Sequence, residues 1–178
     1  MSRYLVAIQE DEQKWIDMAE GANEALENHY RFNIARADAV IAGRALQPSS
    51  TATSLRADDT GGAAVTDGPF VETKEVLGGF YLIEAADDAE ALEIAREVPA
   101  PFGGLEIRPV QDFGGPTRPP KEQADGLSSY VVLLYVDEAR SATMTPEERQ
   151  DLLARHGAFQ AGHDASVLIG DALQQRRT

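Results

Sequence analysis

The chain has 178 residues and a formal net charge of −14, from 16 basic and 30 acidic side chains. This length supports one hydrophobic core plus a smaller appendage. This negative net charge repels the phosphate backbones of nucleic acids, and direct nucleic-acid binding is therefore not expected. The absence of cysteine excludes disulfides, thiolate metal ligands and cysteine nucleophiles.

The N-terminal segment turns acidic by Glu10 and lacks a signal-peptide hydrophobic region, and no apolar run approaches the length of a membrane span. These features and the missing cysteines favour a cytoplasmic protein that does not contact a membrane. The sequence also has no phosphate-binding glycine pattern, nucleophile elbow or metal-ligand spacing. No cofactor and no metal site are therefore predicted.

Hydrophobic periodicity predicts the first elements in chain order. Residues 3–9 are a predicted strand. From Asp11 onward, apolar residues recur every three or four positions, which predicts one long amphipathic helix ending near Asp38. Gly21 is expected to weaken the middle of this helix. Residues 40–43 predict a short second strand or its start.

A hairpin, a buried strand and a helix are predicted next. Residues 51–56 and 63–66 flank a turn cluster and are predicted hairpin partners. Residues 80–83 are apolar without interruption, which predicts a strand buried on both faces. Asp87 and Glu90 have the spacing of an N-cap and N3 pair and begin the helix.

With a last strand at residues 105–110, this order is that of an α+β ferredoxin-like domain, a split βαβ fold over residues 1–113. Two helices can cover only one face of its sheet, yet the apolar strands need burial on both. A homodimer through the other sheet face is therefore predicted. Loops or the C-terminal segment of the same chain are the alternative cover.

Residues 114–127 are rich in Pro, Gly and polar side chains and are a predicted linker. Residues 128–178 then repeat the beginning of the chain. The identical pairs at one offset of 127 positions (156 − 29) include His29 and His156, Phe32 and Phe159, Val40 and Val167, Gly43 and Gly170, and residues 45–47 and 172–174 (ALQ). A half-repeat of strand, helix and strand is predicted, covering an apolar surface of its own first domain or of a second copy. The alternative is a loosely ordered remnant of a longer tandem protein.

The sequence around Asp67 has the strongest turn chemistry, because Gly68 accepts unusual backbone angles and the following proline fixes its own φ. Residues 66–70 (TDGPF), 72–75 (ETKE) and 77–83 (LGGFYLI) resemble the signature of the DGPF-type branch of the YCII-related family. This resemblance covers residues 2–112. It implies a dimeric α/β barrel of ferredoxin-like domains, with a His and Asp pair in a cleft, and a genomic association with extracytoplasmic-function sigma factors.

His29 lies on the apolar face of the predicted helix, where a partly buried imidazole near a carboxylate can act as a general base or acid. Asp67, at its turn, is the carboxylate expected to pair with it. The alternative is a hydrogen-bonded core histidine. His156 occupies the equivalent place in the half-repeat but has no second Asp67 turn, so its predicted role is structural.

Three further residues are predicted to contact a ligand: Trp15, Lys74 and Tyr81. Lys74 is the one cation between Glu72 and Glu75, and it either holds a small anion or belongs to a solvated charged loop. Trp15 either lines the cleft or is part of the core. The sequence thus predicts a domain that binds an unknown small molecule, with His29 and Asp67 supplying acid–base chemistry. The competing prediction is a non-catalytic interaction or regulatory module acting with a sigma factor.

Overall fold

The computed structural model divides into two compact units, Met1–Gln111 and Asp112–Thr178. The structure describes residues 1–18, 22–57, 62–71, 73–111, 126, 128–170, 172 and 173. The predicted linker at 114–127 lies, apart from Gly126, outside the described residues.

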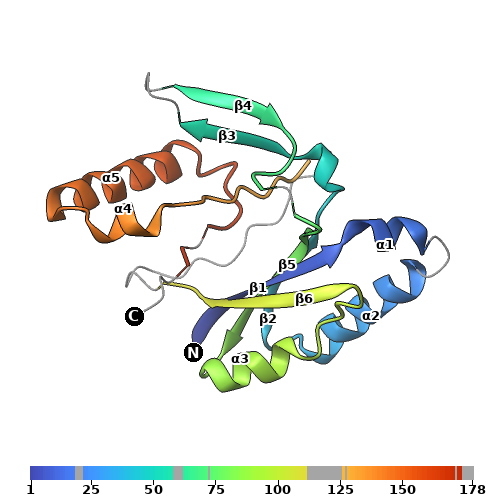
Figure 1. Cartoon of the computed structure of the whole chain (residues 1–178). Helices are drawn as coiled ribbons and strands as arrows, with labels where there is room; N and C mark the ends of the chain where they lie inside the picture. Colours follow the sequence, from blue (N-terminus) through green and yellow to red (C-terminus); the bar gives the residue numbers. More distant parts are fainter. Residues whose placement is uncertain are drawn as a thin grey trace. The chain divides into compact units, whose positions relative to one another are not determined.

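The first unit is α+β (Figure 1). Its main sheet contains β1 (Ser2–Asp11), β2 (Val40–Ala45), β5 (Glu75–Ala85) and β6 (Gly103–Pro109). Its helices are α1 (Glu12–Asp17), α2 (Ala22–Ala35) and α3 (Asp88–Ala95), with a 3-10 turn at Ser49–Thr51. A separate two-stranded sheet is formed by β3 (Thr53–Ala57) and β4 (Ala63–Asp67).

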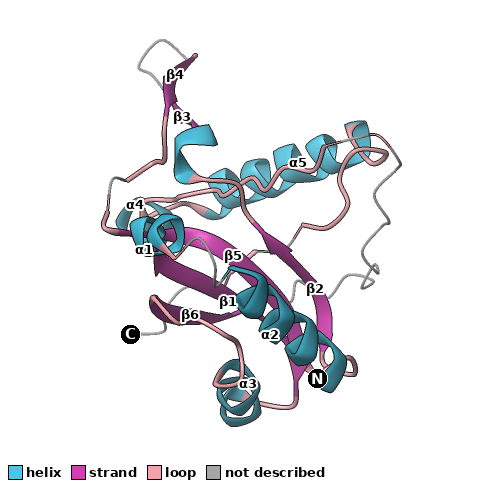
Figure 2. Cartoon of the chain, turned by 90° about the vertical axis from the view of Figure 1, so that its right-hand side faces the viewer, coloured by secondary structure: helices cyan, strands magenta, loops and turns pink. Residues whose placement is uncertain are grey.

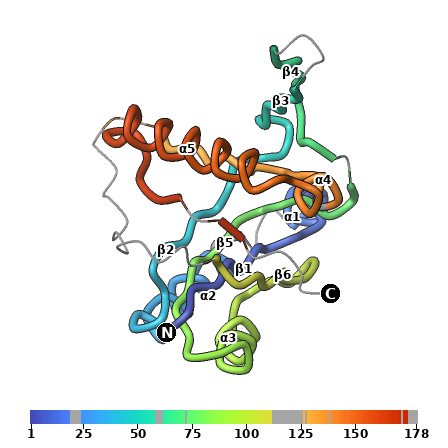
Figure 3. Tube along the Cα trace, turned by 90° about the vertical axis from the view of Figure 1, so that its left-hand side faces the viewer, coloured from blue at the N-terminus to red at the C-terminus, as the bar shows by residue number. Residues whose placement is uncertain are grey.

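The main sheet is antiparallel, with the strand order β2-β5-β1-β6 that Figure 3 shows. This order is compatible with the predicted ferredoxin-like fold, in which the first and third strands of the split βαβ unit lie in the centre. The centre of the sheet is the β1–β5 pair, with Val6 opposite Tyr81. Tyr81, one of the predicted ligand-contacting residues, therefore lies in the centre of the sheet.

The hydrophobic core lies between this sheet and helices α2 and α3 (Figure 2). Side chains alternate along β1, so Tyr4, Val6 and Ile8 all face the helices and are buried. Phe32 reaches the core from α2. Full burial of a side chain such as Val6 contributes about 1.5–3 kcal/mol.

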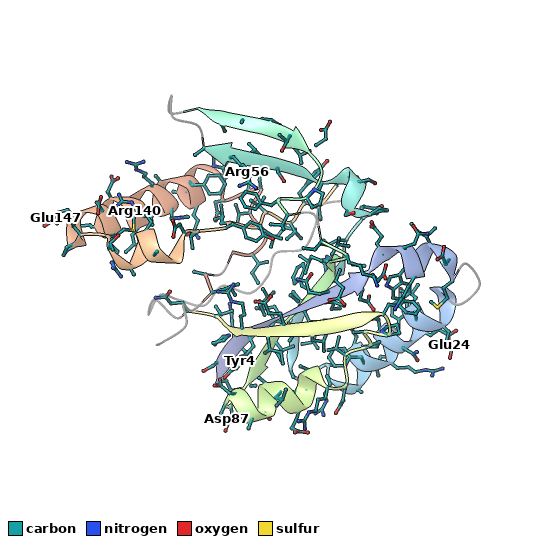
Figure 4. The ribbon with its side chains drawn as sticks, viewed as in Figure 1. Tyr4, Glu24, Arg56, Asp87, Arg140 and Glu147 are labelled. Carbon is teal, nitrogen blue, oxygen red and sulfur yellow. The ribbon has the colours of Figure 1, made fainter. Side chains whose placement is uncertain are left out.

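The start of α3 confirms the predicted cap. Asp87 Oδ1 accepts hydrogen bonds from the backbone N–H groups of Ala89 and Glu90, each at 3.0 Å. Tyr4 donates its hydroxyl proton to Asp88 Oδ1 at 2.8 Å, and Figure 4 shows Tyr4 near Asp87. Burial, together with these two carboxylates, raises the pKa of Tyr4 to about 12. The tyrosine therefore stays protonated and links β1 to α3.

The predicted hairpin is confirmed, because β3 and β4 pair antiparallel with Thr53 opposite Asp67. The chain turns at Gly68, whose φ of +95° lies in the region that favours glycine. The Gly68 N–H donates to the Ala52 carbonyl at 2.8 Å, which closes the turn at the base of the hairpin.

The prediction of one continuous helix from Asp11 to Asp38 is wrong. The chain forms two helices instead, with α1 ending at Asp17 and α2 beginning at Ala22. Gly21, which the sequence marks as a weak point, lies outside the described residues. With only six residues, α1 is a short connection between β1 and α2.

The second unit contains two described helices, α4 (Glu138–Ala142) and α5 (Pro146–Gly162). Thr145 and Glu148 form a capping box at the start of α5. The half-repeat predicts strands at residues 129–136 and 167–170, but the structure gives these residues neither strand nor helix. A strand needs a neighbouring strand with which its backbone can pair, so apolar sequence alone does not create one.

Candidate functional site

The second turn of α2 places His29 against β5. His29 is half-buried, and its Nδ1 lies 3.0 Å from the hydroxyl oxygen of Tyr81. The two rings stack with centroids 6.0 Å apart and planes at 30°. Tyr81 itself is buried in the core. Two of the five predicted site residues, His29 and Tyr81, are thus in direct contact.

Three neighbours hold Tyr81 in place. Asn33, one helical turn after His29, donates from Nδ2 to the Tyr81 hydroxyl at 3.3 Å and to the His29 carbonyl at 2.9 Å. Phe32 packs edge-on against the Tyr81 ring at 4.9 Å. Gly43 on β2 leaves room for that ring, since a Cβ atom there would lie 2.5 Å from it. The position of the His29 contact is therefore fixed by packing on α2, β2 and β5.

A buried carboxylate, that of Glu10, lies at the end of β1 on the helix side of the sheet. Its Oε2 accepts a hydrogen bond from Trp15 Nε1–H at 2.9 Å, and its Oε1 accepts from the Phe102 backbone N–H at 3.3 Å. Trp15 in turn packs edge-on against the Phe102 ring, with centroids 5.3 Å apart. Glu10 is therefore a buried carboxylate with a hydrogen bond to each of its oxygens.

Burial and Glu10 act on His29 in opposite directions. Burial lowers the pKa of the His29 imidazole, and the charge of Glu10 raises it by a smaller amount, so the net pKa lies below the usual value. His29 is therefore neutral at neutral pH. Burial also raises the pKa of Tyr81, although the hydrogen bond from Asn33 opposes this. When Nδ1–H of His29 donates to Tyr81, Nε2 is left as a proton acceptor, and it makes no hydrogen bond with any described residue.

Asp67 lies elsewhere in the first unit, at the end of β4 with an exposed side chain. Within the described residues it has no hydrogen bond or ion pair with His29, and the carboxylate whose charge acts on His29 is Glu10. The pairing of His29 with Asp67 stays a prediction.

The other residues of the turn motif have structural contacts. The Phe70 ring lies under the Arg56 guanidinium of β3 at 3.7 Å, and Arg56 Nη2 also donates to the Phe70 carbonyl at 2.9 Å (Figure 4 labels Arg56). Ser54 Oγ donates to the Gly68 carbonyl at 2.8 Å. Glycine and phenylalanine in this motif thus hold the base of the hairpin.

Lys74, the third predicted ligand-contacting residue, has an exposed side chain whose Nζ lies 3.5 Å from Asp11 Oδ2. Its positive charge is thus directed at the residue that precedes α1. Glu72, part of the same predicted charged loop, lies outside the described residues. Trp15 contacts Glu10 and Phe102 and belongs to the surroundings of the buried carboxylate.

The histidines of the second unit are exposed on or next to α5. The His163 ring stacks on Phe159 with centroids 4.5 Å apart, and its Nδ1 contacts the Phe159 carbonyl at 2.9 Å. In the described part of the chain no three His, Asp or Glu side chains are grouped so that they could hold a metal ion.

The sequence predictions missed Glu10 and Asn33. Alternation along β1 could have found Glu10, because it follows Tyr4, Val6 and Ile8 at spacings of two and so faces the helices. Asn33 follows His29 by four positions, which puts both on one face of α2. A search for carboxylates expected on the helix side of the sheet would have given Glu10 as a second candidate partner for His29, in addition to Asp67.

Comparison with known proteins accounts for the first unit. A model of the YCII-related domain matches residues 2–114. The chain belongs to the YCII-related family. It is also 46% identical over 68 residues to the uncharacterized protein R00369 of Rhizobium meliloti (strain 1021), a match that spans 36% of this chain and 54% of that protein. The chain thus matches only about half the length of this curated relative. None of the helices in the described part of this family member has the length and apolar character needed to cross a bilayer.

Proposed function

We propose that this YCII-related protein binds a small polar molecule beside His29 and that His29 Nε2 exchanges a proton with it. The observation that carries the proposal is the half-buried imidazole of lowered pKa, held at Nδ1 by Tyr81 and hydrogen-bonded to no described residue at Nε2. A base that is neutral at neutral pH is ready to accept a proton.

The chemistry follows from the neighbours of His29. As Nε2 takes a proton, Nδ1–H continues to donate to Tyr81, and the nearby charge of Glu10 stabilises the imidazolium. Asn33 keeps the Tyr81 oxygen in position. Because Glu10 and the net charge of −14 disfavour anions, the proposed ligand is neutral or positively charged and carries an acidic proton.

An NMR titration of His29 tests whether Glu10 or Asp67 is the carboxylate that raises the His29 pKa. Replacing Glu10 with Gln removes a charge that raises the His29 pKa, so we expect the pKa to fall further. The matched variant Asp67→Asn, on exposed β4, is expected to leave it unchanged. The opposite pattern, a shift in Asp67→Asn and none in Glu10→Gln, would show that Asp67 is the partner and remove Glu10 from the site.

Binding itself is tested by following the His29 imidazole resonances against a fragment set of neutral, cationic and anionic molecules. We expect shifts from neutral or cationic fragments, weakened in Tyr81→Phe because that variant releases Nδ1. A set in which only anions bind, or in which binding is unchanged in His29→Gln, would contradict the proposed site.

The assignment to the DGPF branch, a cytoplasmic location and a homodimer through the sheet belong to the same proposal. The motif around Asp67 supports the first. The homodimer is proposed from the uninterrupted apolar sequence of β1 and β5, which needs burial on both faces of the sheet.

The second candidate function is a non-catalytic interaction module. Its supporting observation is the exposed apolar segment 130–136 of the second unit, since contiguous exposed apolar surface marks interaction sites. The sigma-factor association implied by the family resemblance belongs to this candidate. A binding assay with purified extracytoplasmic-function sigma factors, using Val132→Asp as the control, separates it from the ligand site: binding that this variant abolishes favours the interaction module.

A further inference from the structure

The second unit follows the first in the placement of its helices. Asp137 and Glu138 correspond to Asp11 and Glu12 at an offset of 126 (137 − 11), and each pair spans the start of a short helix, α4 or α1. The long helix α5 ends at Gly162, 127 positions after the end of α2 at Ala35. Residues 130–136 therefore correspond to β1, and residues 167–170 to the start of β2.

Burial is reversed between corresponding positions. Val6 is 0% exposed and its counterpart Val132 is 80% exposed, while Ile8 is 5% exposed and Leu134 is 73%. Phe32 of α2 is 4% exposed, whereas Phe159 of α5 is 56% exposed. The second unit thus presents, on its strand-like segment and its long helix, the apolar residues that form the core of the first.

The first unit shows what buries such a surface. Its β1–α1–α2–β2 half packs against the β5–α3–β6 half, with β1 and β5 antiparallel in the centre and β2 on the far side of β5. The two halves are thus related as the halves of a symmetric pair. Two identical β-α-β segments can take these same places if each comes from a separate chain.

We infer that residues 128–170 of two chains assemble into one shared ferredoxin-like domain. The two copies of residues 130–136 pair antiparallel in the centre of the shared sheet. Residues 167–170 of each chain pair with residues 130–136 of the other chain, as β2 pairs with β5. The apolar sides of the two α5 helices then cover one face of this sheet. A second copy of the chain thus covers the exposed apolar surface. Each chain supplies two strands, so two chains complete the four-stranded sheet.

Charge distribution favours the antiparallel arrangement. Residues 130–136 contain no charged side chain, while Asp137 and Glu138 follow directly. In a parallel, in-register pair, each Asp137 would lie opposite its own copy, which is destabilising. In an antiparallel pair centred near Leu133, Asp137 lies opposite Ser129 instead.

Disulfide trapping in the full 178-residue chain tests the pairing, because the chain has no cysteine of its own. The variants are Val131→Cys, Val132→Cys and Leu133→Cys, and the control is Val65→Cys, an exposed valine on β4. In the paired complex, one cysteine meets its copy at an effective concentration in the millimolar range, against about 10 µM protein in solution. We therefore expect at least one variant to form covalent dimer about 100-fold faster than the control. Rates equal to the control at all three positions would overturn the inference.

Two further arms fix the orientation and the occupant. A mixture of Tyr130→Cys and Val136→Cys is expected to cross-link between the two variants and not within either, because only antiparallel pairing brings opposite ends together. Homodimers of both end variants would overturn the antiparallel arrangement. Cysteines that are protected from alkylation in a monomeric chain would show that the run is covered within its own chain, and this would overturn the shared domain.

Sedimentation measures self-association without cysteine variants, so it tests the pairing even if a cysteine variant fails to fold. Val132→Asp is expected to weaken self-association of the second unit by about tenfold or more in sedimentation experiments, because an unpaired carboxylate would be buried. Leu55→Asp, at an exposed apolar residue of β3, is the matched control and should leave it unchanged. Equal association of both variants and the parent chain would contradict the shared domain.

Discussion

Residues 4–10 and 130–136 begin with the same tyrosine and are largely apolar, yet only the first of them is a strand. In the first unit, β5 and β6 pair with both edges of β1, and α2 and α3 cover one of its faces. In the second unit, residues 130–136 form no strand, and their apolar side chains are exposed. Apolar sequence thus permits a strand, whereas a pairing strand and a covering layer stabilise it.

The largest effect is expected from removing a partner of β1. A Cβ atom on Gly103, at the start of β6, would lie 1.9 Å from the Gln9 carbonyl oxygen, so Gly103→Ala must push β6 away from β1. We expect a loss of about 3 kcal/mol or more in the free energy of unfolding, measured by urea denaturation. Gly104→Ala is the control, since a Cβ atom there meets nothing within 4 Å. Equal losses in the two variants would show that β6 does not depend on this close approach.

Matched valines test the burial difference itself. Val6→Ala removes fully buried methyl groups and is expected to cost about 2 kcal/mol. Val132→Ala changes an exposed side chain and is expected to cost less than about 0.5 kcal/mol in dilute solution. Urea midpoints at low protein concentration give both values. A cost for Val132→Ala as large as that for Val6→Ala would mean that the second segment is buried within the single chain.

Matched glycines test the site. Gly43→Ala would bring Cβ to 2.5 Å from the Tyr81 ring, so we expect it to displace the ring, lower stability by about 1–3 kcal/mol and shift the His29 pKa. Gly170 lies 127 positions later (170 − 43), and a Cβ atom there would have only ordinary contacts at 4.0 Å. Gly170→Ala is therefore expected to have little effect. An unchanged His29 titration in Gly43→Ala would separate the Tyr81 position from the properties of His29.

The smallest expected effect is on pH dependence. Because burial holds the His29 pKa in the folded protein below its unfolded value of about 6.5, the folded state binds fewer protons. The resulting stability is present above about pH 6.5 and is lost as the pH falls towards the folded pKa. His29→Gln should remove this loss, while His156→Gln, at the equivalent position on α5, should retain it. Urea midpoints compared at mildly acidic and neutral pH measure the difference, and identical acid losses in the parent and His29→Gln would contradict it.

Much of the first unit could be predicted from sequence because local chemistry and periodicity agree there. The β3–β4 hairpin follows from a turn cluster between two extended runs, and the start of α3 follows from Asp87 as N-cap. The break between α1 and α2 was not predicted, since the apolar spacing of three and four continues across it. The strand expected at 129–136 failed because residue preference says nothing about whether a pairing partner is present.

The candidate site was predicted only in part. The apolar neighbours of His29 in sequence identified its face of α2, and the contact with Tyr81 joined two predicted residues. The carboxylate was harder to find, because the charge of Glu10 acts on His29 only once α2 packs against the sheet, and no motif links the two residues. Asp67 was favoured by its turn, a local signal that carries no information on distance from His29.

The comparison between the two units is tested most directly by hydrogen exchange of the unmodified chain at about 1 µM and about 100 µM. The backbone amides of β1 serve as an internal reference and are expected to be protected at both concentrations. We predict that the amides of residues 130–136 exchange rapidly in the dilute sample and become protected in the concentrated one, as a second copy supplies the missing strand. Rapid exchange at both concentrations, or protection at both, would contradict the account.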